Sequence, residues 1–322
     1  MRNTNIVKKA NKYSIKEAAK IIRLGGIVAF PTETVYGLGA NALDPVAVGK
    51  IFEIKKRPSF DPLIVHISSL KDLPKLAHAT KLSKKIAAKF WPGPLTIVLP
   101  KKQLVPDLVT SGLNTIAIRM PDNKIALKII SESKVPIAAP SANKFGHLSP
   151  TKPEHILKNL KGINLIIDGG KTKIGLESTI ITLKGNICKI LRPGAITKDD
   201  LKHSFPQIRF SEFKRKKIIS PGILKSHYAP KKPLLIINKK NKNKIEREKS
   251  ALISFSGKDI IGYKKVIFLT KNGNLLEYAS KLFSTLHKLE KENIDWIVVE
   301  PVPKKGIGIA IMDRLEKASF KG

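Results

Sequence analysis

The sequence predicts an α/β protein with three parts: a mixed-sheet domain over residues 1–205, a linker over 206–232 and a smaller parallel-sheet domain over 233–322. Three observations lead to this prediction. Short apolar runs rich in β-branched residues recur along the chain, and segments with helix-capping residues separate them. The linker is basic and then rich in proline and glycine. Beyond it, strands alternate with helices, as they do in parallel sheets.

The first elements lead into an unusual loop. Residues 14–17 match a capping box, and the helix that it opens ends at a pair of glycines. A strand buried on both faces follows over 27–30, and Pro31 ends it because proline has no N–H to donate. The stretch FPTETVYGLGA (30–40) then predicts a loop in which hydroxyl groups and two glycines let the backbone approach a small ligand. A polar turn that leads into a helix is the alternative interpretation.

The remaining elements follow from the same patterns. Helices are predicted over 44–55, 81–90 and 123–131, after a second capping box at 151–154, and near 274–291 and 307–319. Strands are predicted over 63–67, 95–100, 115–120 and 135–140, in NLIIDGG, STIITL and ICKILRPG, and then over 234–237, in ALISF and KVIFL, and over 295–300.

Composition excludes several classes of protein. Hydrophobic residues make up 42% of the 322, which is enough to build buried cores and argues against a disordered chain. No apolar run reaches the roughly 18 residues that a membrane span needs, and the first residues lack the apolar segment of a signal peptide. A single cysteine, Cys188, excludes an internal disulfide and a multi-cysteine metal site. We therefore expect a cytoplasmic protein that does not contact membranes.

The formal charge of +35 favours a polyanionic partner such as RNA. A genome biased toward A/T-rich codons would give the same charge, because 51 of the 60 cations are lysines spread along the whole chain. Only nine arginines are present, so an arginine is expected where a rigid bidentate fork matters. Arg57, Arg119 and Arg192 are three such positions.

Familiar catalytic motifs are absent from the sequence. GGKTK (169–173) lacks the first glycine of a phosphate loop, and GIGIA (306–310) lacks the third glycine of a dinucleotide fingerprint. The histidine spacing fits no zinc site, and no GxSxG elbow occurs. A hydrolase or a metalloenzyme with protein ligands is therefore not expected.

Polar side chains gather instead at the ends of predicted elements. Lys55, Lys56 and Arg57 end a helix, where they suit a triphosphate or a carboxylate, or offset the helix dipole. Thr115 and Arg119 share one face of a strand, and a charge on a packed strand needs an anion beside it.

Further polar groups repeat this pattern. His66 lies within a strand, where it is either a ligand or a core residue, and Ser141, Asn143, Ser178 and Arg192 lie at strand ends. Because almost no catalytic acid or base accompanies them, the set predicts a site that positions several anions while the substrates supply the chemistry.

Longer motifs occur in a characteristic order: FPTETVYGLGA, KxRP before PLIVH, WPGPLTIVL, TIAIRMP, APSAN and DGG…ESTI…LRPGA. Together they resemble the YrdC family. SPGILKSHYAP and GIAIMDRLEKA are similar to the long, two-domain form of the family's threonylcarbamoyl-AMP synthases, so the resemblance covers nearly the whole chain. It implies a YrdC-like twisted mixed sheet whose helices form a basic cleft, a linker that covers the cleft as a lid, and a Rossmann-like parallel C-terminal domain.

The resemblance also implies a nucleotidyltransferase reaction. L-threonine, bicarbonate and ATP would form L-threonylcarbamoyladenylate and pyrophosphate, and a separate transferase complex would modify tRNA beside the anticodon. Mg²⁺ would be the cofactor, held by the ATP phosphates and water with no protein ligand. Such a reaction needs positioning and charge neutralisation, so no covalent enzyme intermediate is expected, and any direct tRNA contact would be weak.

Site residues follow from the same resemblance. For L-threonine it implies Thr34, His66, Arg119, the backbone of Ala139, and Ser178, with Arg119 forking onto the carboxylate. For ATP it implies Lys55, Arg57, Asp61, Thr115, Ser141, Asn143, Ser149, Arg192 and Tyr228. Among these, the residues that would position the triphosphate are Lys55, Arg57, Ser141 and Asn143.

Three positions depart from the family pattern. Lys56 stands where glycine is usual, Asp61 where asparagine is usual, and Ser226 where arginine is usual, with Lys225 as a replacement cation. An aspartate that faced ATP would repel it unless it worked through magnesium or turned away.

Two other functions fit parts of the sequence. A non-enzymatic RNA-binding module fits the charge of +35, but an aromatic content of 6% offers no platform for stacked bases. Tight tRNA binding at physiological salt without ATP would favour it. A carbamoyl-adenylating enzyme of hydrogenase maturation contains a similar domain, but its cysteine-rich zinc modules are excluded by the single cysteine here.

Overall fold

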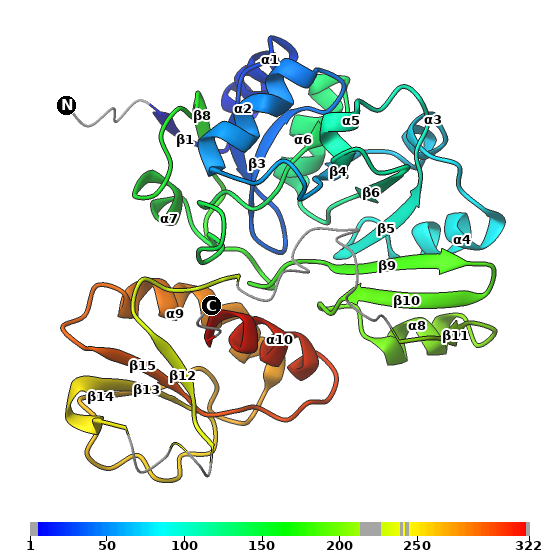
Figure 1. Cartoon of the computed structure of the whole chain (residues 1–322). Coiled ribbons are helices and arrows are strands. Elements are labelled where there is room, and N and C mark those ends of the chain that lie inside the picture. The colour runs from blue at the N-terminus through cyan, green and yellow to red at the C-terminus, as the bar shows by residue number, and fades with distance from the viewer. Residues whose placement is uncertain (1–5, 213–226, 239–240, 242–244, 320–322) are drawn as a thin grey trace.

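The computed structural model describes residues 6–212, 227–238, 241 and 245–319. Within these residues, an eleven-stranded mixed sheet and a four-stranded parallel sheet make up the molecule (Figure 1). Helices cover both, so the predicted α/β class with one mixed and one parallel sheet is confirmed. No helix in this part of the chain is long and apolar enough to cross a membrane.

The large sheet uses strands from the first 210 residues. These are β1 (Val7–Lys9), β2 (Val28–Pro31), β3 (Tyr36–Asn41), β4 (Ile64–His66), β5 (Leu95–Pro100), β6 (Thr115–Arg119), β7 (Ile137–Ala138), β8 (Leu165–Asp168), β9 (Thr179–Lys184), β10 (Ile187–Arg192) and β11 (Arg209–Phe210). Their order is β1-β8-β2-β3-β7-β4-β6-β5-β9-β10-β11, with parallel and antiparallel neighbours mixed. The short strand β11 lies in the range predicted to be linker and pairs with β10.

The helices around this sheet begin mostly where capping residues predict them. They are α1 (Lys12–Arg23), α2 (Pro45–Lys55), α3 (Leu73–Leu76), α4 (Lys81–Phe90), α5 (Asp107–Thr110), α6 (Lys124–Ser133), α7 (Glu154–Leu157) and α8 (Lys198–Ser204), with a 3₁₀ turn at Leu70–Asp72. Asp44 caps α2, and its side chain accepts the backbone N–H groups of Val46 and Ala47.

Both predicted capping boxes are wrong in detail. The N-cap of α1 is Asn11, and Ser14 is the third residue of the helix, where its hydroxyl accepts the Asn11 N–H. Asparagine therefore begins the helix one turn earlier than the pattern at 14–17 indicated. The second box precedes only the four-residue helix α7, which has no side-chain cap.

The stretch 30–40 forms a β-hairpin, so the helical alternative is wrong and the predicted loop is confined to the turn at 32–35, which lines the cavity described below. β2 and β3 pair antiparallel from Val28 opposite Gly39 to Pro31 opposite Tyr36. Glycine is needed at 39 because a Cβ there would lie 2.5 Å from Cε1 of Phe30 and 2.9 Å from Cγ2 of Ile137. The glycines thus permit close packing within a strand and do not form turns.

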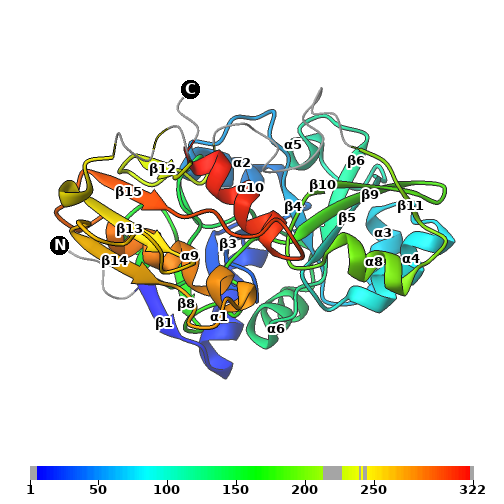
Figure 2. The same ribbon diagram turned by 90° about the horizontal axis from the view of Figure 1, so that it is seen from below.

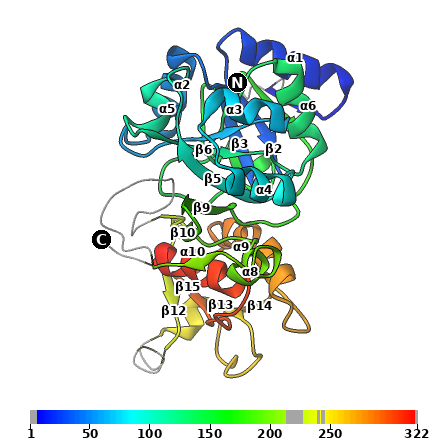
Figure 3. The same ribbon diagram turned by 90° about the vertical axis from the view of Figure 1, so that its right-hand side faces the viewer.

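The C-terminal part contains β12 (Leu234–Ile236), β13 (Ser250–Ser254), β14 (Lys265–Phe268), β15 (Trp296–Val299), α9 (Leu275–Leu289) and α10 (Gly308–Ser319), with a 3₁₀ turn at Arg247–Lys249. The strand order is β12-β15-β13-β14, all parallel. The helices α9 and α10 lie on the side of this sheet that faces the large sheet (Figure 3). Seen from below, α10 lies between the small sheet and the hairpin of β9 and β10 (Figure 2).

One apolar cluster joins the two parts. Val35, Leu148 and Leu176 from the large-sheet part are buried with Tyr228 against residues of α9 and α10, among them Phe283. Val35 belongs to the turn of the β2–β3 hairpin, so this turn is packed between the two parts of the molecule.

Replacing Gly39 by alanine tests the hairpin. We expect Gly39→Ala to lower the free energy of unfolding by about 1–3 kcal/mol, because the added Cβ must displace Phe30 and Ile137. The matched control is Gly49→Ala in α2, where a Cβ would meet no atom within 4 Å. This control should gain about 0.5–1 kcal/mol from higher helix propensity. Urea unfolding measures both changes, and equal stabilities would contradict the packing argument.

Candidate active site

A cavity lies at the strand ends of the large sheet, and His227 and Tyr228 from the predicted linker range form part of its lining. It has about 560 Å³ of empty space, which includes the open solvent at its mouth. Nine residues that the resemblance implies line it: Thr34, Arg57, His66, Arg119, Ala139, Ser141, Ser178, Arg192 and Tyr228. They come from distant parts of the sequence, and the sheet order brings them together.

Arg119 is buried at the end of β6 and is held from two sides. Its Nη1 donates to Oγ1 of Thr34 at 2.9 Å, and its Nη2 lies 2.6 Å from Oε1 of the buried Glu33. Sequence reasoning missed Glu33, although a carboxylate next to Thr34 in an otherwise uncharged stretch is a usable signal. The ion pair fixes a guanidinium that points into the cavity region.

His66 lies beside Arg119 because β4 and β6 pair in parallel with these two residues in register. Burial, and then the charge of Arg119, lower the pKa of His66 from 6.5 to about 3. The imidazole is therefore neutral at physiological pH. It can donate a hydrogen bond to a ligand or accept one from it without adding a positive charge to the site.

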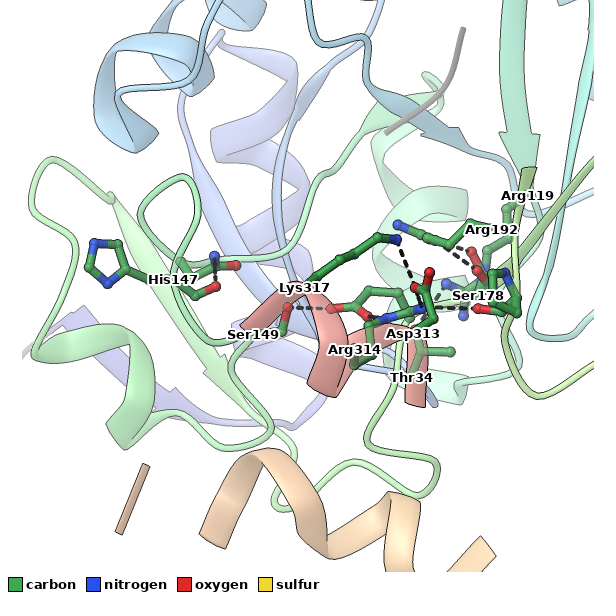
Figure 4. Close-up of polar contacts among 12 residues, drawn as sticks. Thr34, Arg119, His147, Ser149, Ser178, Arg192, Asp313, Arg314 and Lys317 are labelled. Carbon is green, nitrogen blue, oxygen red and sulfur yellow. Dashed lines mark hydrogen bonds and ion pairs between the residues drawn. The ribbon is translucent and has the colours of Figure 1, made fainter. Parts of the chain in front are cut away.

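A second arginine is hydrogen-bonded to a pair of hydroxyl groups. Nε and Nη2 of Arg192 donate to the carbonyl and the hydroxyl of Ser178, each at 3.1 Å. The Ser178 hydroxyl in turn lies 2.7 Å from Oγ1 of Thr96 on the neighbouring strand. Figure 4 shows Arg119, Arg192 and Ser178 close together. Two fixed guanidinium groups thus lie in one cavity.

Lys55 lies behind the cavity wall instead of lining it. Its Nζ donates to the backbone carbonyls of Ser141 at 2.6 Å and Asn143 at 2.5 Å. Burial, and then the charge of Arg57, lower the pKa of Lys55 well below its ordinary value. In this structure the lysine shapes the loop at 141–143, and the Asn143 side chain donates to the carbonyls of Lys144 and His147.

Asp61 turns toward Arg57 and not into the cavity. Its Oδ2 lies 2.9 Å from Nη2 of Arg57, and Nε of the same arginine donates to the Asp61 carbonyl at 2.9 Å. Burial raises the pKa of Asp61, while Arg57 and Lys55 oppose that rise. The aspartate at this unusual position therefore orients Arg57.

Lys56, the other departure nearby, ends α2 in the left-handed conformation at φ 50°, which glycine adopts without strain.

Thr115 and Ser149 also lie outside the cavity lining. Thr115 is at the opposite end of β6 from Arg119, opposite Pro100. The hydroxyl of Ser149 donates to Oε1 of Glu177, a buried residue that does line the cavity. Thr115 therefore does not line the cavity, and Ser149 contacts the cavity only through Glu177.

Glu177 is the second acidic residue that sequence reasoning missed. Its Oε2 accepts a hydrogen bond from Nε of Arg314 on α10 at 2.7 Å. Burial raises the pKa of Glu177, but the charges of Arg314 and Arg192 and hydrogen bonds from Arg314 and Ser149 outweigh it and lower that pKa. The carboxylate is thus ionised in the cavity wall. It belongs to the ESTI motif, from which the sequence predicted only Ser178 as a site residue.

Tyr228 closes one side of the cavity. It adopts φ 62°, and its ring lies 5.1 Å from the Arg314 guanidinium and 5.8 Å from the ring of Phe283. Burial raises its pKa to about 12, so the hydroxyl stays protonated. The next residue, Ala229, donates its N–H to the carbonyl of Gly146 at 2.8 Å. The residues Lys225 and Ser226, and the basic stretch before them, lie outside the described part.

Comparison of the chain with known proteins identifies the class of protein to which this fold and cavity belong. Residues 20–194 match the model of the Sua5/YciO/YrdC family, described as "Telomere recombination", and residues 196–319 match the threonylcarbamoyl-AMP synthase C-terminal domain. The chain belongs to the Sua5/YciO/YrdC family, in its two-domain form, as the motifs implied.

Named relatives match over nearly the full length. The threonylcarbamoyl-AMP synthase of Pyrococcus abyssi is 42% identical, with 98% of this chain and 96% of the relative covered. The Bacillus subtilis synthase is 41% identical, with 96% and 94% covered. The crystal structure of P. abyssi Sua5 complexed with L-threonine superposes with a TM-score of 0.87 at 41% identity, covering 98% of this chain and 96% of that one. Escherichia coli YciO matches only 58% of this chain, at 25% identity and a TM-score of 0.51.

The neutral His66 predicts a pH dependence of stability. The unfolded chain takes up a proton near pH 6.5, whereas folded His66 does so only near pH 3, so stability is lost as the pH falls between these values. We expect His66→Gln to reduce the slope of unfolding free energy against pH by up to about 1.4 kcal/mol per pH unit. Urea unfolding from about pH 7.5 to about pH 4.5 measures it. His78→Gln, on an exposed side chain, is the matched control, and an unchanged slope in His66→Gln would contradict the prediction.

Proposed function

We propose that this chain is a threonylcarbamoyl-AMP synthase, which forms L-threonylcarbamoyladenylate and pyrophosphate from L-threonine, bicarbonate and ATP. The observation that carries the proposal is one cavity with three fixed guanidinium groups, Arg57, Arg119 and Arg192, a neutral His66 and strand-end hydroxyls. Full-length relatives with this name support it. The product would pass in the cytoplasm to a transferase complex that modifies tRNA beside the anticodon, with at most weak direct contact to tRNA.

L-threonine would bind at the Arg119 end of the cavity. Its carboxylate matches the guanidinium fork, whose direction Glu33 and Thr34 already hold. The neutral imidazole of His66 beside it can hydrogen-bond to the substrate without competing for the carboxylate. The similarity to P. abyssi Sua5, solved with L-threonine, supports this choice of substrate.

ATP would bind toward Arg57, Arg192 and Ser141, with Tyr228 covering it. The threonine amine, once deprotonated, attacks the carbon of bicarbonate or carbon dioxide and forms a carbamate. A carbamate oxygen then attacks the α-phosphorus, and pyrophosphate leaves. The side chains of this cavity position the reactants and offset their negative charge, which is the main requirement of phosphoryl and nucleotidyl transfer.

Magnesium would be carried by the ATP phosphates and water. The three acidic side chains nearest the cavity, Glu33, Asp61 and Glu177, each lie within 3 Å of an arginine, so they suit orientation of cations and not metal binding. The described residues contain no cluster of three or more potential metal ligands. When bound, the ion offsets the charge of the triphosphate.

Excess EDTA is expected to stop pyrophosphate release, and added magnesium to restore it.

Pyrophosphate release from ATP tests the reaction. The purified full-length chain is assayed complete and with L-threonine or bicarbonate omitted in turn. Release that requires both supports the proposal. Release without threonine would indicate a different adenylation, and no release with tight tRNA binding would indicate an RNA-binding module.

Substitution of Arg119 tests the threonine site. We expect Arg119→Lys to lower kcat/KM for L-threonine by roughly 30-fold or more, since lysine cannot form the bidentate contact. The KM for ATP should change much less, because Arg119 is assigned to the threonine carboxylate and not to ATP. Arg209→Lys, on the exposed end strand β11, is the matched control. An equal rise in the KM values for L-threonine and ATP would contradict the assignment.

A further inference from the structure

We propose that Arg314, on the last helix of the C-terminal part, is a positioning residue for the ATP site: it neutralises Glu177 in the cavity wall and so lets the triphosphate bind beside it. This inference rests on the proposed function and adds a role for the C-terminal part in it. Arg314 does not line the cavity and would act through Glu177 and Tyr228.

Every side of the Arg314 guanidinium is engaged. Its side chain is fully buried, its Nε donates to Oε2 of Glu177 at 2.7 Å, and its Nη2 donates to the carbonyl of Pro193 at 3.0 Å. Nη1 donates to Oδ2 of Asp313 at 2.6 Å, and the Tyr228 ring lies 5.1 Å away. One cation of α10 therefore contacts the cavity wall, the strand end after Arg192 and the residue that covers the cavity.

The charges around Arg314 balance. Lys317, one turn further along α10, also donates to Oδ2 of Asp313 at 2.7 Å. Asp313 is thus shared by Arg314 and Lys317, so Arg314 offsets the charge of Glu177 as well as part of the charge of Asp313. Figure 4 shows Arg314, Asp313 and Lys317 gathered on α10.

Without Arg314, Glu177 would work against ATP. Glu177 lines the same cavity as Arg192, and the two charges interact. An unmasked carboxylate there would repel phosphate oxygens and compete with them for Arg192. It would also lack its strongest partner in a buried setting, where a lone charge is costly. Masking Glu177 therefore keeps Arg192 available for the triphosphate.

A second contact holds the same wall from the C-terminal part. The hydroxyl of Ser149 donates to Glu177, and the backbone carbonyl of Ser149 accepts a hydrogen bond from Nε2 of His287 on α9 at 3.1 Å. Two helices of the C-terminal part thus hold Glu177, α10 through Arg314 and α9 through Ser149. Ser149 lies outside the cavity lining and contacts it through Glu177.

Magnesium-ATP binding by isothermal titration calorimetry tests the proposal on the full-length chain. Arg314→Met is compared with the double variant Glu177→Gln/Arg314→Met and with Glu316→Gln. The last is a control that breaks an exposed ion pair of the same helix, with Lys304. Binding is measured near pH 6.5 and near pH 8.5. The groups that face Glu177 are Arg314 from α10, Arg192 from β10, Ser149, and Tyr228.

We expect Arg314→Met to raise the Kd for magnesium-ATP by roughly 2- to 30-fold. The loss should be no smaller at the higher pH, because burial favours the protonated form of an unmasked Glu177 and a protonated carboxyl does not repel phosphate. The double variant should return to within about twofold of the wild type, since it removes both charges. The wild type and Glu316→Gln show how far the Kd for magnesium-ATP changes with pH when Arg314 is intact.

An unchanged Kd in Arg314→Met would overturn the proposal. So would a double variant as weak as the single one at both pH values, because the contact would then be structural only. If Arg314→Met does not fold, Arg314→Lys replaces it, and the double variant should bind at least as tightly as Arg314→Lys. A wild type that does not bind magnesium-ATP would instead refute the proposed function, so the two failures are distinguishable.

Discussion

The guanidinium groups in and beside the cavity are buried, and each is paired with a buried carboxylate or with backbone carbonyls. Arg119 pairs with Glu33, Arg57 with Asp61 and Arg314 with Glu177. A buried cation without such a partner is costly, so these pairs are required for the cavity to exist as observed. They also fix the direction of each fork before a substrate arrives. The acidic residues are therefore committed to orientation, which leaves the chemistry to the reactants.

The parts of the fold that were predictable are those with dense local signals. The apolar run of β5 and the Asp-Pro start of α2 each carry their information within a few residues. The hairpin of β2 and β3 was missed because its strand alternates glycine with larger residues, a pattern that local rules assign to turns. Glycine is present there because of Phe30 and Ile137, and the latter contact is tertiary.

The candidate site shows the same limit. Motifs named the residues around the cavity, but a motif does not say where a side chain points. Lys55 faces backbone carbonyls and Asp61 faces Arg57, although both had been implied as ATP contacts. Arg314 lies 137 positions from Glu177, so no local pattern could pair them. Such partners become visible only when the chain is folded.

The pairing of Arg314 with Glu177 constrains how this architecture can change over evolutionary time. A descendant that lost the C-terminal part would inherit a bare carboxylate in the wall of its cavity, with only Arg192 left to offset it. Loss of the C-terminal part would therefore favour replacement of Glu177 by an uncharged residue, so the two parts of this chain do not behave as independent modules.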